Sequence, residues 1–217
     1  YDIGDLKAAV SLAGKAAADA VPLKAEIEEL QALIMLVRTR GKEENLNRAR
    51  AIVRDLKLTR ENLLVEFAYL HFLLEINAKD DLINHYKYLE PGMTKMRDDI
   101  EYPRMLNTST EIHVLLGENK KAAVLLSESA RLAKSGNLVG DEITSQILAG
   151  KVAFDDGNFE EAFNHCKSAL KLCKEASLTI KTTDEKNLFM NKPKMVFMVK
   201  LIRQLNEKIG TKQKAGI

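Results

Sequence analysis

The residues of this 217-residue chain that could support nucleophilic catalysis are its two cysteines and the histidine beside one of them. His165 precedes Cys166, and a thiolate next to an imidazole is what a cysteine nucleophile requires. Adjacent residues of a helix point about 100° apart, however, so the two side chains do not face each other. The same predicted helix separates Cys166 from Cys173 by two turns, roughly 10 Å, which is too far for a disulfide. We expect free thiols packed as small hydrophobic side chains in a reducing compartment, with reactive thiols as the alternative.

Metal binding would require ligands that the sequence offers only in pairs. His71 with Glu75, and Asp81 with His85, lie four residues apart and could share an ion on one helical face. Without a third ligand in register, an ion pair or a hydrogen bond on the helix surface explains each pair better. We therefore expect no metal site.

Two segments resemble ligand-binding loops only in part. Residues 136–140 (GNLVG) lack the third glycine and the Lys-Ser/Thr ending of a phosphate-binding loop, and we expect a connection between repeats there. Residues 155–161 (DDGNFEE) lack the ligand spacing of a calcium loop, and an acidic first helical turn explains them better. The sequence therefore predicts no cofactor and no enzymatic activity, and a hydrolase or transferase would have no catalytic constellation.

Composition indicates an all-α protein with no strong electrostatic field. Only 4 Pro and 11 Gly occur and 29% of residues are charged, which suits helices. The net charge of +2 does not favour nucleic acid or an anionic membrane as a partner. No apolar run reaches the roughly 18 residues of a membrane span, and no signal-peptide pattern is visible. We expect a cytoplasmic protein, or a nuclear one in a eukaryote.

Similar short segments recur at nearly constant spacing and predict the elements that position these residues. Their lead residues, Gly4, Gly41, Asn77, Gly117 and Gly157, lie 37, 36, 40 and 40 positions apart. A period of this size is typical of helical hairpins stacked in an array. We expect hairpins at residues 23–57, 60–90, 101–135 and 141–175, preceded by a lone second helix at 1–20 and followed by a helix at 193–209.

The hairpin at 141–175 has the clearest pattern. Asp141 is the expected N-cap of its first helix, as Thr59 is two hairpins earlier. The segment from Gly150 to Ala169 resembles a tetratricopeptide repeat, with a small residue in the first helix, a Gly-Asn turn, then Phe159 and small residues in the second helix. The first helices lack the family's Trp, the closing proline is missing, and two periods reach 40 instead of about 34. The resemblance implies a right-handed α-α superhelix of about four to five hairpins plus a C-terminal capping helix, with small residues where paired helices touch.

The two ends of the expected array leave alternatives open. Residues 1–20 match a second helix without its partner, which indicates a fragment of a longer solenoid; the alternative is a simple N-terminal helix packed on residues 23–39. An unpaired helix would expose an apolar stripe and could cause self-association. The last helix fits either a cap or an amphipathic target helix. Its expected apolar face comprises Met195, Met198, Val199, Ile202, Leu205 and Ile209.

The resemblance also implies that the first helices line a concave surface that binds a partner. The expected binding residues in the two N-terminal hairpins are Gln31, Met35, Arg38, Leu64, Phe67, His71 and Leu74. Those in the two C-terminal hairpins are Arg104, Asn107, Glu111, Thr144, Ile147, Lys151 and Phe154. Each of these could instead be an ordinary packing residue. The paired Lys and Asn residues with which some members grip acidic chaperone tails are missing from this surface.

The sequence therefore favours a non-catalytic module that binds a peptide or helix of a partner protein within a larger assembly. The alternative is a peptide- or signal-sensing domain of a larger regulator. RNA binding is a third hypothesis, which would need a basic stripe with stacking aromatic residues, and the expected surface has few of these.

Overall fold

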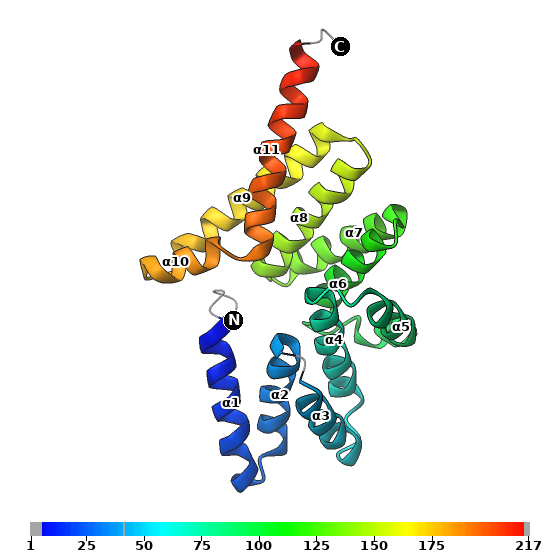
Figure 1. The fold of residues 1–217 in the computed structure, drawn as a ribbon, viewed down its shortest axis with the longest axis vertical. Coiled ribbons are helices and arrows are strands. Elements are labelled where there is room, and N and C mark those ends of the chain that lie inside the picture. Colours follow the sequence, from blue (N-terminus) through cyan, green and yellow to red (C-terminus); the bar gives the residue numbers. More distant parts are fainter. Residues whose placement is uncertain (1–5, 41, 215–217) are drawn as a thin grey trace. The chain divides into compact units, whose positions relative to one another are not determined.

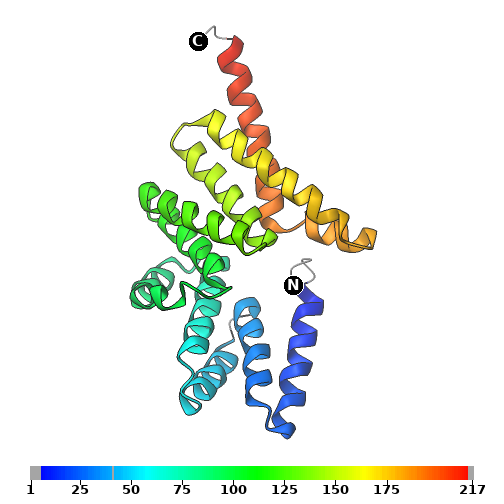
Figure 2. The same cartoon turned by 180° about the vertical axis from the view of Figure 1, so that it is seen from behind.

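The computed structural model describes the backbone of residues 6–40 and 42–214 and the side chains of residues 7–40 and 42–208. All regular structure in these ranges is helical, which confirms the all-α fold class (Figures 1 and 2). The elements are α1 (Leu6–Leu23), α2 (Glu26–Arg40), α3 (Glu43–Asp55), α4 (Thr59–Glu75), α5 (Lys79–Leu89), the 3₁₀ helix η1 (Glu90–Met96), α6 (Tyr102–Leu115), α7 (Asn119–Ser135), α8 (Val139–Asp155), α9 (Phe159–Leu178), α10 (Thr183–Met190) and α11 (Pro193–Lys214). The lead residues Gly4 and Gly41 and the side chain of Ile209 lie outside the described residues.

The described residues form two compact units that divide between Asp99 and Ile100. In the first unit, α1 packs on α2, α4 packs on both α2 and α3, and α5 packs on α4. In the second unit, α8 packs on both α6 and α7, α9 packs on α8, and α11 packs on α8 and α9. Within each unit, the first helix of one hairpin therefore contacts both helices of the hairpin before it.

The same turn joins many of the successive helices. One residue of each such turn has a positive φ between 54° and 78°, and the next amide N–H donates to the carbonyl five residues back, as from Asn158 to Ala153. This is the Schellman arrangement, and glycine adopts its left-handed position without strain. The residues at that position are Lys24, Lys57, Asn77, Gly117, Asn137 and Gly157. Residues 136–140 are thus such a turn and the start of the next helix.

The predicted N-caps Asp141 and Thr59 are wrong. The N-cap positions are Leu138 for α8 and Leu58 for α4, and neither makes a side-chain capping bond. The tight Schellman turn leads directly into the next helix, so the helix begins earlier than the capping pattern suggests. Asp141 instead lies in the first turn of α8 and forms an ion pair with Arg104 of α6.

Small residues allow α8 and α9 to approach each other closely. A Cβ atom added to Gly150 would lie 2.9 Å from Cys166 Sγ and 3.3 Å from the carbonyl oxygen of Ala162. Ala162 and Ala169 are fully buried on α9. A larger residue at position 150 would therefore push the two helices apart.

Helix α11 covers the last hairpin with one apolar face. Met195, Met198, Leu201 and Leu205 are buried against α8 and α9. The predicted face was wrong at Val199, which is exposed, because Leu201 occupies the centre of the buried stripe instead. No helix among the described residues is long and apolar enough to cross a membrane.

Candidate functional site

The structure buries three of the fourteen predicted binding residues. In the first unit Phe67 is buried, Gln31 is exposed, and the half-buried residues are Met35, Arg38, Leu64, His71 and Leu74. In the second unit Asn107 and Ile147 are buried, and the half-buried residues are Arg104, Glu111, Thr144, Lys151 and Phe154. The three buried residues contribute to packing in this structure.

Several predicted residues of the second unit already have partners within it. Glu111 forms an ion pair with Lys194 of α11, and Lys151 forms one with Asp155. Ile147 lies in the core cluster to which α9 and α11 contribute. Helix α11 therefore covers part of the face of α8 that the sequence assigned to a partner.

Asn107 belongs to a buried polar network that joins α6, α7 and α8. The hydroxyl oxygens of Ser129 and Ser145 each lie 2.9 Å from Asn107 Oδ1. Asn107 Nδ2 donates to the carbonyl oxygen of Asp141 at 3.1 Å. Because buried polar groups must find partners, this network fixes how the three helices align.

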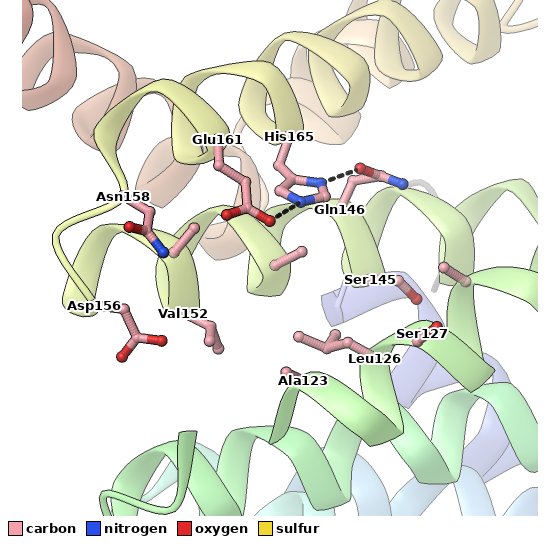
Figure 3. Close-up of a pocket in the computed structure, with 13 residues that line it drawn as sticks. Ala123, Leu126, Ser127, Ser145, Gln146, Val152, Asp156, Asn158, Glu161 and His165 are labelled. Atoms are coloured by element: carbon pink, nitrogen blue, oxygen red, sulfur yellow. Dashed lines mark hydrogen bonds and ion pairs between the residues drawn. The ribbon is translucent and has the colours of Figure 1, made fainter. Parts of the chain in front are cut away.

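A groove opens between α7, α8 and α9, on a face of α8 that the sequence did not single out (Figure 3). This α7–α9 groove has a volume of about 340 Å³. Its apolar lining residues are mostly small: Ala123, Leu126, Ala130, Ala149, Val152 and Ala153. Its polar lining residues are Ser127, Ser145, Gln146, Asp156, Asn158, Glu161 and His165. None of the fourteen predicted binding residues lines this groove.

The polar lining of the groove is asymmetric. Asp156 and Glu161 lie at the end beside the α8–α9 turn, whereas Ser127 and Gln146 lie toward the other end (Figure 3). Asn119 Nδ2 donates to Asp156 Oδ1 at 2.6 Å. Within the described part of the chain, neither carboxylate forms an ion pair with a lysine or arginine. One end of the groove therefore carries two carboxylates that no lysine or arginine neutralises.

His165 connects the acidic end of the groove to its neutral end. Its Nδ1 lies 2.9 Å from Gln146 Oε1, and its Nε2 lies 3.8 Å from Glu161 Oε1 (Figure 3). With the amide oxygen accepting, Nδ1 carries the proton and Nε2 is directed toward the carboxylate. The imidazole therefore holds Gln146 in place at the groove wall.

The cysteines lie in the hydrophobic core of the second unit. Both are free and buried, and burial raises the pKa of each thiol to about 11. Cys173 Sγ lies 3.2 Å from Met195 Sδ, within the contact between α9 and α11. His165 contacts Gln146 and Glu161 at the groove, so the adjacent Cys166 and His165 point into different environments.

A second charged cluster lies in the first unit and joins α3, α4 and α5. Arg50 donates two hydrogen bonds to the buried Glu66 carboxylate, at 2.7 and 2.6 Å, and its guanidinium lies 5.9 Å from the Tyr69 ring centroid. His85 Nε2 lies 3.1 Å from Glu66 Oε2, so His85 pairs with Glu66 and the predicted pairing with Asp81 is wrong. Burial raises the pKa of Glu66, but the hydrogen bonds from Arg50 and the close approach of His85 outweigh this effect and lower it to about 2.

The other predicted i,i+4 pair is present, with His71 Nε2 at 4.0 Å from Glu75 Oε1. In the ranges that the structure describes, no three His, Cys, Asp or Glu side chains are arranged to hold a metal ion. A scan against protein-family models found no family that matches the chain, and a search of curated proteins found no relative.

The alanines that line the groove are the only feature of the sequence by which it could have been predicted. Ala149 and Ala153 lie one turn apart on α8, and Ala123 and Ala130 lie two turns apart on α7. Alanine is also the best helix former and a common core residue, so its spacing cannot separate a groove from a tight helix contact.

Proposed function

We propose that this protein is a tetratricopeptide-like interaction module that binds a peptide or helix of a partner protein in the α7–α9 groove. The observation that carries the proposal is the groove itself, which combines an apolar lining of small side chains with a polar, partly charged margin. Partner segments that dock in helical grooves bury apolar side chains in such a surface and use polar groups at its margin for specificity.

The helix packing supports the family part of this proposal. In each unit, the first helix of a hairpin packs on both helices of the preceding one, and Gly150 allows close contact between α8 and α9. The proposal therefore includes a right-handed superhelix of hairpins in which α11 is the C-terminal cap. The binding surface that we propose differs from the concave surface of the first helices, because α11 covers part of that face.

Filling the groove tests the proposed function. Ala123 lines the groove from α7 and is exposed, so a bulky side chain there would occupy the groove without entering the core. The full chain is used to capture proteins from a lysate of the source cells, and quantitative mass spectrometry measures the amount of each captured protein. We expect the Ala123→Trp variant to capture at least tenfold less of one defined partner than the unmodified chain does. The tryptophan would prevent the partner from making its central hydrophobic contact, and the loss of such a contact weakens binding by about this factor.

Val124→Trp is the matched control, because Val124 is the next residue on α7, is 68% exposed and does not line the groove. The control should capture the same partner as the unmodified chain, and both variants should keep the far-ultraviolet circular dichroism of a helical protein. The proposal is wrong if no captured protein distinguishes the two variants.

A further inference from the structure

In the described structure, no lysine or arginine pairs with the two carboxylates at the acidic end of the α7–α9 groove. The ionisable residues among the lining side chains are Asp156, Glu161 and His165. Two lysines on these helices pair with other carboxylates: Lys121 with Glu118, and Lys151 with Asp155. The lining therefore carries two carboxylates and one imidazole, and a cationic ligand group would complement the carboxylates.

The middle of the groove requires an apolar ligand group. Leu126 and Val152 are buried in one hydrophobic cluster, with Ala149 packed against it, and Ala123 and Ala130 leave space beside them because they end at Cβ. A volume of about 340 Å³ accommodates a few side chains and not a folded domain. A short segment with aliphatic side chains would exclude water from this surface.

The acidic and the apolar parts of the lining are not spread evenly along the groove. A ligand that matches both parts must therefore lie in one direction. Asp156 lies at the end beside the α8–α9 turn, Glu161 and Val152 lie next along the groove on opposite walls, and Leu126 lies toward the neutral end at Ser127 and Gln146 (Figure 3). An acidic ligand would bring like charges together at the turn end and would be rejected.

We infer that the occupant of the α7–α9 groove is a partner segment that places one or more aliphatic side chains over Leu126 and Val152 and a Lys or Arg side chain between Asp156 and Glu161. This inference rests on the proposed function and adds the chemical class of the partner. The aliphatic groups supply the binding energy at the centre, and the basic residue sets the direction in which the segment lies.

The experiment selects ligands without assuming a sequence. Random 15-residue peptides displayed on phage are selected on the immobilised full chain, and each enriched peptide is then synthesised and tested on the Ala123→Trp and Val124→Trp variants. Peptides that lose affinity only for Ala123→Trp are groove ligands. We expect these peptides to share a Lys or Arg near aliphatic residues.

Neutralising the carboxylates tests the charge contact. The double variant Asp156→Asn/Glu161→Gln keeps the shape of both side chains, and the amide oxygen introduced at the first position would still accept the hydrogen bond from Asn119. We expect groove peptides to bind it about tenfold more weakly, since hydrogen bonds to charged groups contribute this much, and to show less dependence on salt. The matched control is Glu160→Gln/Glu175→Gln, which removes two exposed carboxylates from α9 outside the groove and should change affinity little.

The outcomes separate the inference from the proposed function. Groove peptides that lack basic residues, or that bind the neutralised double variant as well as the unmodified chain, overturn the inference and leave the proposed function standing. If no enriched peptide distinguishes Ala123→Trp from Val124→Trp, both fail. If analytical ultracentrifugation shows a dimer that Ala123→Trp alone disrupts, the occupant is a second copy of the chain and the inference is wrong.

Discussion

At the scale of single residues, Glu66 is a buried carboxylate that stabilises the first unit through its ion pair with Arg50. Its pKa of about 2 lies below the value of about 4.3 expected in an unfolded chain, so the folded state binds a proton less readily. The stabilisation is complete above the unfolded pKa and is lost as the pH falls toward 2. Glu66→Gln should lower the free energy of unfolding by about 2 kcal/mol at pH 7 and by less at pH 3. The value at pH 7 is modest because the Arg50 side chain is 40% exposed.

Urea unfolding followed by circular dichroism at both pH values measures this difference. Glu43→Gln is the control, because Glu43 lies in α3 and is exposed, and it should change stability by no more than about 0.5 kcal/mol. An equal loss of stability in Glu66→Gln at pH 7 and pH 3 would show that the ionised carboxylate is not the source.

At the scale of helices, the contact between α8 and α9 depends on the absence of a side chain at Gly150. Gly150→Ala should destabilise the protein by about 1–2 kcal/mol, because overpacking against Cys166 Sγ and the Ala162 carbonyl exceeds the gain in helix propensity. Cys166→Ala in the same chain removes the 2.9 Å clash, so the double variant should be more stable than the two single effects would give together.

Gly140→Ala provides the comparison within α8. An added Cβ at that position meets no atom within 4 Å, and the substitution should be neutral or stabilise by up to about 1 kcal/mol. Thermal unfolding of the unmodified chain, Gly150→Ala, Cys166→Ala and the double variant completes the double-mutant cycle. Strict additivity of Gly150→Ala and Cys166→Ala would argue against direct contact between the two positions.

At the scale of the whole chain, the second unit contains hydrophobic clusters made entirely of its own residues. One joins α8, α9, α10 and α11, and the other joins α6, α7 and α8. A fragment of residues 100–217 should therefore fold alone, with helical circular dichroism and a cooperative thermal transition. A fragment that is unfolded, or that melts without cooperativity, would show that this unit depends on residues 1–99.

The sequence by itself determined what local chemistry controls. Apolar spacing of three and four residues predicted helices, and glycine at 117 and 157 marked two hairpin turns because it adopts a positive φ without strain. The turns at Lys24 and Lys57 have no glycine at the position of positive φ, so the sequence did not indicate them in this way. Tertiary structure alone decided which faces are free: α11 packs against α8 beside Ile147, while the alanines of α7 and α8 leave a groove on another face. Burial depends on elements far apart in the chain, and an alanine or leucine has the same local helical preference whether a neighbouring helix covers it or leaves it open.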